Sequence, residues 1–118
     1  MNDQEIEREI QAKGKTAPRI TPTDIEMNIE SEHYFTAADG AIGENRLGSN
    51  PTYIPSSLNL LTICVLVLKN GFAVTGESAC ASPENFDVEI GRKIARECAI
   101  EKMWPLMGYE LRSKLASK

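Results

Sequence analysis

The sequence predicts an α+β domain in which an antiparallel β-hairpin sheet packs with a long C-terminal helix and N-terminal helices, assembled as a homo-oligomer. Three observations lead to this prediction. Asn70-Gly71 joins two apolar runs, as in a tight hairpin. Apolar residues recur at four-residue spacing after Ser82, as on one face of a helix. At 118 residues the chain has the length of one small domain.

The composition is typical of a globular protein and disfavours several functional classes. Charged residues make up 25% of the chain and apolar residues 42%, which argues against disorder. A net charge of −4 argues against a duplex-DNA-binding protein, because phosphate neutralisation dominates that affinity. The longest apolar run, residues 58–68, is too short to span a membrane, and the acidic N-terminus lacks the apolar segment of a secretion signal. We therefore expect a cytoplasmic protein with no membrane partner.

The three cysteines, Cys64, Cys80 and Cys98, are spaced by 16 and 18 residues in apolar sequence. A structural zinc site needs four clustered nitrogen or sulfur ligands, and the one histidine, His33, lies 31 residues before the first cysteine. We expect the cysteines to be small buried side chains and His33 to be an ordinary interior or surface residue. The protein is therefore expected to hold no metal and no other cofactor.

Residues 1–20 are predicted to form a helical arm and a connector in front of a single domain that spans residues 21–118. The helix covers residues 3–13, carries Ile6 and Ile10 on one side, and ends at Lys13-Gly14. Two apolar residues cannot form a core, so the arm must dock on the body, dock on a neighbouring subunit, or fray.

A second helix is predicted to begin at Thr21, because Thr21 can cap it, Pro22 suits the first helical position, and Asp24 completes a capping box. The helix would run to about Tyr34. The residues on its core-facing stripe would be Ile25, Ile29 and His33.

Residues 37–57 are predicted to be irregular, because glycines and prolines interrupt any periodic pattern in this segment. They are Gly40, Gly43, Gly48, Pro51 and Pro55. A loop of about twenty residues is unusual in a compact domain and is either functional or mobile. We expect a mobile loop.

Residues 60–68 and 72–80 are predicted to form the strands of the hairpin, joined by a type I′ turn at Asn70-Gly71. The first strand is apolar on both faces. One face carries Leu60, Thr62, Cys64, Leu66 and Leu68, and the other carries Leu61, Ile63, Val65 and Val67. Both faces should be covered, either by a helix on each side or by a partner subunit, and we expect this strand to mediate self-association.

The longest helix is predicted to begin near Ser82-Pro83, with Ser82 or Asn85 as its N-cap. Apolar residues repeat along it at Phe86, Ile90, Ile94 and Cys98. The small residues beside them, which would let the helix lie close on the hairpin, are Gly91, Ala95 and Ala99. Trp104-Pro105 is predicted to break or kink the helix before a last helical piece.

The sequence contains no complete motif of a common enzyme class. Gly76–Cys80 resembles the G-x-S-x-G nucleophile elbow of hydrolases, but its fifth residue is cysteine and the one histidine precedes it. The carboxylates fall on predicted solvent-exposed helix faces, and neither a Walker motif nor G-x-G-x-x-G occurs. We therefore do not expect an enzyme.

Arg92, Lys93 and Arg96 place three cations within two turns of the long helix. One interpretation is a salt-bridged surface, because Glu89 and Glu97 can pair with Lys93. The other is a phosphate clamp, because arginine forks bind phosphate oxygens bidentately.

The phosphate clamp would recruit further groups around the start of the helix. Asn85 and the helix N-terminus would contribute polar contacts to an anion. Phe72 and Tyr34 would offer aromatic rings on which a base can stack. The candidate ligand-binding residues are therefore Arg92, Arg96, Asn85, Phe72, Lys93 and Tyr34.

The segment from Thr62 to Asp87 (TICVLVLKNGFAVTGESACASPENFD) resembles the signature of a family of small tailed-phage proteins. The family is named after gene product forty-nine of one phage and gene product sixty-six of another. The resemblance continues through Ile90–Arg96 (IGRKIAR) to Trp104–Tyr109 (WPLMGY) and covers residues 21–115. It implies a small, non-enzymatic accessory protein of a phage or prophage, a kind of protein that often acts against host defence.

The size and the hairpin-plus-helix plan are similar to those of phage proteins that sequester cyclic nucleotide alarm signals, such as Thoeris anti-defence and anti-CBASS proteins. We therefore expect an anti-defence protein that binds a cyclic oligonucleotide or a cyclic ADP-ribose isomer in the host cytoplasm without cleaving it, in a pocket at a subunit interface. Two alternatives stay open. One is a protein–protein inhibitor of a host enzyme, and the other is a structural or assembly protein of the phage particle.

Overall fold

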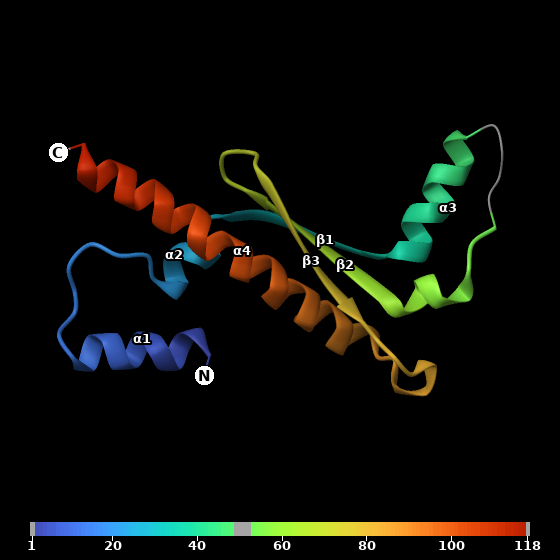
Figure 1. The fold of residues 1–118 in the computed structure, drawn as a ribbon, viewed down its shortest axis with the longest axis horizontal. Helices are drawn as coiled ribbons and strands as arrows, with labels where there is room; N and C mark the ends of the chain where they lie inside the picture. The colour runs from blue at the N-terminus through green and yellow to red at the C-terminus, as the bar shows by residue number, and fades with distance from the viewer. Residues whose placement is uncertain (1, 49–52, 118) are drawn as a thin grey trace.

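The computed structural model describes residues 2–48 and 53–117. One long helix crosses one face of a three-stranded antiparallel sheet, and shorter helices lie at the two ends of the sheet (Figure 1). The elements in chain order are α1 (Asp3–Ala12), α2 (Pro22–Met27), β1 (Ile29–Thr36), α3 (Ala37–Leu47), η1 (Ser56–Leu60), β2 (Leu61–Leu68), β3 (Ala73–Ala79), η2 (Pro83–Asn85) and α4 (Val88–Ala116). The strands are ordered β1-β2-β3. The α+β class, the hairpin and the long C-terminal helix are confirmed.

Helix α1 lies where the sequence places it and docks on the body of the protein. The Asn2 side chain caps its first turn by accepting a hydrogen bond from the Glu5 amide at 2.8 Å. Gly14, with a φ of 68°, ends it in the left-handed conformation that suits glycine. Trp104 of α4 donates from Nε1 to the Asp3 carboxylate at 3.1 Å. The arm therefore docks on the body of its own chain, which is the first of the three predicted alternatives.

Helix α2 begins as predicted, since Thr21 and Asp24 form a complete capping box, but it is much shorter than expected. It ends at Met27, and residues 29–36 form strand β1 instead of the predicted helix to Tyr34. The predicted stripe through Ile29 and His33 therefore does not exist. Tyr34, Phe35 and Thr36 favour extended backbone, and pairing with β2 outweighs the weak four-residue spacing.

The prediction of irregular structure is wrong for residues 37–47, which form α3. Thr36 caps this helix, and Asp39 closes a capping box with the same T-x-x-D spacing as at the start of α2. Gly40 and Gly43 lie within the helix, where each reduces helix stability without ending it. Residues 49–52 of the predicted loop, which include Pro51, lie outside the described residues.

The hairpin is confirmed, but its turn is not of type I′. That type requires a positive φ at both central residues, and Gly71, at 89°, is the one residue near the turn that has it. The Leu68 amide donates to the Phe72 carbonyl at 2.8 Å, and the Gly71 amide donates to the Leu68 carbonyl at 2.9 Å. The loop therefore has three residues, Lys69, Asn70 and Gly71, and closes on a left-handed glycine.

Helix α4 begins later than predicted and is continuous. Asp87, and neither Ser82 nor Asn85, caps it, by accepting a hydrogen bond from the Ile90 amide at 3.0 Å. Pro105 lies inside the helix without breaking it. Met103 and Met107, on either side of Pro105, pack in or against the core, and these contacts offset the cost of the lost backbone hydrogen bond.

The small-residue strip of α4 lies against the sheet as predicted. Gly91, Ala95 and Ala99 are buried, whereas Ile90 and Ile94 of the neighbouring stripe are 58% and 45% exposed. The helix backbone therefore approaches the sheet closely over β2 and β3. The buried apolar residues of the resulting core are Ile25, Cys64, Leu66, Leu68, Val74, Ala95, Ala99 and Met103.

The core lies on one face of the sheet. Residues of β2 alternate between fully buried side chains under α4 and half-buried side chains on the opposite face. Of the two predicted ways to cover the strand, a helix on each side is not found, because the other helices of the described chain lie at the ends of the sheet (Figure 1). Among the described residues, no helix is long and apolar enough to cross a membrane.

Candidate functional site

Four of the six predicted ligand-binding residues come together where α4 passes beside β1. Tyr34 lies on the helix-facing side of β1, and Arg92, Lys93 and Arg96 lie on the adjoining side of α4. With Val88 and Glu89 these residues line an open cavity of about 390 Å³. The strand supplies the aromatic ring and the helix supplies the cations. We call these six residues the Arg92 cavity.

Arg92 stacks on the ring of Tyr34, with its guanidinium carbon 5.4 Å from the ring centroid. The Tyr34 hydroxyl donates to the Glu32 carboxylate at 2.7 Å. Burial of Tyr34, and then this hydrogen bond, raise the pKa of the phenol well above its usual value, so the ring stays neutral. Among the described residues, Arg92 has no carboxylate partner, so its N–H groups are available to a ligand.

Arg96 is held by two carboxylates and forms the salt-bridged alternative. Its Nε donates to Glu32 at 3.0 Å, and one of its terminal nitrogens donates to Glu26 at 2.6 Å. These hydrogen bonds raise the pKa of Arg96 and, at Glu32, lower the pKa of the carboxyl. The structure therefore does not present Arg96 as the second half of a phosphate clamp. Lys93 pairs with Glu89 at 3.3 Å, but both side chains are largely exposed.

The Arg96 ion pair predicts how stability depends on pH. Arg96 holds the folded-state pKa of Glu32 below its usual value of 4.5, so the unfolded chain binds a proton there more readily. Glu32 therefore contributes stability above a pH of about 4.5, and the contribution is lost as the pH falls through the folded-state pKa. We expect urea unfolding of Glu32→Gln to show a shallower loss of stability on acidification than the wild type.

Glu30→Gln is the matched control for this measurement. Glu30 is on the same strand and pairs with Lys69, but both side chains are more than half exposed, so the pair contributes little. Its variant should keep the pH dependence of the wild type. Equal acid sensitivity of Glu32→Gln and the wild type would contradict this account of Arg96.

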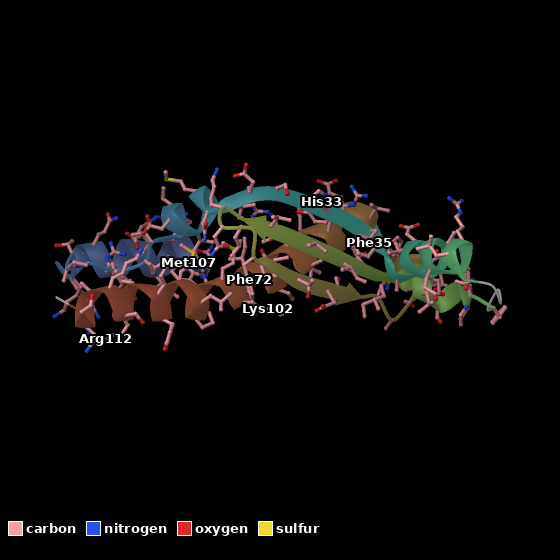
Figure 2. The ribbon with its side chains drawn as sticks, turned by 90° about the horizontal axis from the view of Figure 1, so that it is seen from above. His33, Phe35, Phe72, Lys102, Met107 and Arg112 are labelled. Atoms are coloured by element: carbon pink, nitrogen blue, oxygen red, sulfur yellow. The ribbon has the colours of Figure 1, made fainter. Side chains whose placement is uncertain are left out.

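The structure does not bring Asn85 and Phe72 to the Arg92 cavity. Asn85 lies in η2 and lines a separate cavity of about 120 Å³ beside Phe86. Phe72 lies at the hairpin turn near Met107, roughly 20 Å farther along α4 at 1.5 Å per residue (Figure 2). Phe72 is therefore too far from Arg92 to share one small ligand with it on a single chain, and Asn85 lines a cavity of its own.

The structure does not support the predicted anion site at the start of the long helix. The carboxylate of Asp87 occupies the N-terminus of α4 and accepts the hydrogen bond that an external anion would take. The segment 82–85 forms a 3-10 turn outside the helix rather than its first turn.

The segment that resembles a nucleophile elbow lies in the sheet. Gly76 to Ala79 are part of strand β3, and Ser78 pairs with Thr62 of β2, so these residues do not form the sharp turn of an elbow. Cys64 is fully buried, and burial raises the pKa of its thiol. Within the part of the chain that the structure describes, no cluster of three or more potential metal ligands occurs.

Sequence reasoning missed Glu26 and Glu32, the partners of Arg96. They lie 70 and 64 residues before it, and no local pattern links them. Recognition of residues 29–36 as a strand would have placed Glu32 and Tyr34 on one face, because side chains two apart in a strand point the same way.

Comparison with known proteins identifies one family. The model of the family described as "Phage protein (N4 Gp49/phage Sf6 gene 66) family" matches residues 20–115, which confirms the resemblance indicated by the Thr62–Tyr109 segment. No curated protein matches the chain. No solved structure matches it either.

Proposed function

Because the chain belongs to the phage protein (N4 Gp49/phage Sf6 gene 66) family, we propose that it is a phage accessory protein that acts in the host cytoplasm by binding, and that it sequesters a nucleotide-derived immune signal without cleaving it. The ligand class is a cyclic oligonucleotide or a cyclic ADP-ribose isomer. The protein would protect the phage by lowering the free concentration of the signal.

The observation that carries the proposal is Arg92, stacked on Tyr34 beside an open cavity. The ring restrains the guanidinium, so less side-chain entropy is lost when a ligand binds. The N–H groups at the edge of the guanidinium plane can form a bidentate contact with a phosphate. Lys93 adds a second positive charge, and the outer face of the guanidinium can accept a stacked base.

The proposed site has fewer residues than the sequence suggested. Arg92, Lys93 and Tyr34 contact the ligand in this proposal, whereas Arg96 holds α2 against α4 through Glu26 and β1 against α4 through Glu32. A cavity of about 390 Å³ is in the size range of small-ligand sites. Because the cations are exposed, binding should weaken as the salt concentration rises.

Calorimetric titration with cyclic dinucleotides, cyclic trinucleotides and cyclic ADP-ribose isomers tests the proposal. We expect micromolar or tighter binding of one class, with the ligand recovered unchanged by mass spectrometry. Arg92→Ala should weaken binding by at least about tenfold, since a hydrogen bond to a charged group contributes roughly 1.5–3 kcal/mol.

Arg112→Ala is the matched control, because Arg112 is an exposed arginine on the same helix far from the cavity (Figure 2). It should leave the affinity unchanged. The absence of heat with all three ligand classes, or equal losses in the two arginine variants, would contradict the proposal.

A second candidate function is inhibition of a host protein by direct contact. Helix α3 projects from the end of the sheet (Figure 1) and carries Leu47, which is 91% exposed, and Ile42, which is 42% exposed. An exposed leucine at the end of a projecting helix can fill a hydrophobic pocket of a partner protein. Affinity purification from host lysate distinguishes the two candidate functions. A host protein that co-purifies in stoichiometric amount with the wild type but not with Leu47→Glu supports inhibition. A nucleotide that is released when the purified protein is heated supports sequestration.

A further inference from the structure

The side of the sheet that faces away from α4 presents an apolar surface that we call the open face. Its centre is formed by the half-buried β2 residues Leu61, Ile63, Val65 and Val67. Its flanks are their pairing partners, which are Ser31, His33 and Phe35 on β1 and Ala73, Thr75, Glu77 and Ala79 on β3.

No helix of the described chain packs over the centre of the open face. Helix α4 covers the opposite side, where Cys64 and Leu66 are fully buried, and the remaining helices lie at the ends of the sheet (Figure 1). A strand that is apolar on both sides is typical of a sheet with both faces covered. Charge is sparse on the open face. Glu77 is its carboxylate, and at the β3 edge the Lys102 ammonium of α4 donates to the Thr75 hydroxyl at 3.3 Å. The sequence of β2 is therefore typical of a strand that is buried on both faces, whereas the described chain packs a helix on one face.

The chain exposes more surface than a compact monomer of its mass. The chain exposes 8314 Å², whereas a compact monomer of 13.0 kDa exposes about 6,300 Å². Its radius of gyration is 18.2 Å, against about 13.5 Å for a compact domain of this length. The excess of about 2,000 Å² is shared between the open face and the helices that project beyond the sheet, and it leaves room for an interface of standard size, about 800 Å² per partner.

We propose that the open face is a homodimer interface, in which the open faces of two copies pack against each other as the two layers of a sandwich. A second copy fits because the surface is complementary to itself. A two-fold axis parallel to the strands sets β1 of one copy over β3 of the other. His33, an imidazole on one edge strand, then lies over the Thr75–Glu77 stretch of the second copy, which carries the carboxylate, while the aliphatic centres meet.

This dimer leaves the Arg92 cavity on the outside. Tyr34 and Arg92 lie on the α4 side of the sheet, and the open face is on the other side. In this dimer, self-association through β2 would not bring the arginines to the subunit interface, which differs from the arrangement that the sequence suggested. Each copy keeps its own cavity, and the dimer is independent of the proposed ligand.

Sedimentation equilibrium of the wild-type protein at tens of micromolar tests the proposal. We expect a mass of twice 13.0 kDa. Ile63→Glu, at the centre of the open face, should sediment as a monomer. Ile90→Glu is the matched control, since Ile90 is 58% exposed on α4, away from the open face, and its variant should remain a dimer.

A milder variant guards against loss of folding in Ile63→Glu. Val65→Thr keeps the β-branched shape and adds one hydroxyl per copy to the interface, so it should fold and raise the dimer dissociation constant by at least about tenfold. Circular dichroism and Trp104 fluorescence report folding in each variant. A wild type that stays monomeric at every concentration would overturn the proposal, and so would a wild type that forms a one-to-one complex with a different protein instead of a dimer. A folded Ile63→Glu protein that remains a dimer would overturn it as well.

Discussion

Replacement of Gly76 by alanine is expected to destabilise the protein by more than about 4 kcal/mol, enough to unfold much of a marginally stable domain. Gly76 is on β3 and faces α4. A Cβ atom there would overlap the backbone carbonyl oxygen of Ala95 and the backbone amide nitrogen of Ala99. Because both clashing groups belong to the helix backbone, no side-chain rotation can relieve them, and α4 must move off the sheet.

Gly108→Ala is the matched control for this substitution. Gly108 lies in α4, and beyond its chain neighbours and the helix's own backbone no heavy atom lies within 4 Å of its ideal Cβ position. Alanine also favours a helix more than glycine does. This variant should gain roughly 0.5–1 kcal/mol. Urea denaturation followed by circular dichroism at one fixed protein concentration measures both. A Gly76→Ala protein as stable as the wild type would show that α4 does not lie against β3 as described.

Replacement of Met103 by alanine is expected to cost about 3 kcal/mol, within the usual range for truncation of a buried large side chain. Met103 is fully buried in the core cluster that also contains Ile25 of α2 and the buried residues of the sheet. Truncation would leave a cavity between α2, α4 and the sheet, which come from different parts of the chain. Those elements cannot collapse together without shifting α4 along its length.

Two further variants separate the cavity effect from the chemistry of methionine. Met27→Ala removes the same side chain from a position that is 69% exposed, and it should change stability by less than about 0.5 kcal/mol. Met103→Leu conserves volume and should cost less than about 1.5 kcal/mol. Thermal and urea unfolding measure all three, and equal losses at Met27 and Met103 would contradict the core as described.

Short-range signals in the sequence predicted much of this fold. Thr21 with Asp24, Asn70 with Gly71, and the strip from Gly91 to Ala99 each act over a few residues, and each lies in the element that was predicted. The capping box at Thr36 carries the same signal as the one at Thr21. It was missed because the glycines that follow it argue against a helix.

The remaining features depend on contacts between distant segments. Strand β1 exists because it pairs with β2, about thirty residues later in the chain, and its own sequence does not distinguish a strand from the end of a helix. Because residues 29–34 were predicted to be helical, the pairing of Arg96 with Glu32 and the contact of Arg92 with Tyr34 could not be predicted. Glu32 and Tyr34 lie on one face of the strand, where Glu32 forms an ion pair with Arg96 and the ring of Tyr34 lies under Arg92. Two arginines that look equivalent in the sequence therefore have different roles.

The two proposed surfaces assign different tasks to the two sides of the sheet. The α4 side carries the Arg92 cavity, and the opposite side carries the dimer interface. Variants at Arg92 should therefore change ligand affinity without changing mass, and variants at Ile63 should change mass without changing the cavity itself.

Native mass spectrometry of the protein purified from infected cells tests the central claim most directly, because it reports assembly and retained ligand in one spectrum. We expect a species of twice 13.0 kDa that carries additional mass and releases an intact nucleotide on denaturation. A bare chain of 13.0 kDa, with nothing bound and no second copy attached, would contradict the claim that this phage protein works as a self-associating, nucleotide-binding protein.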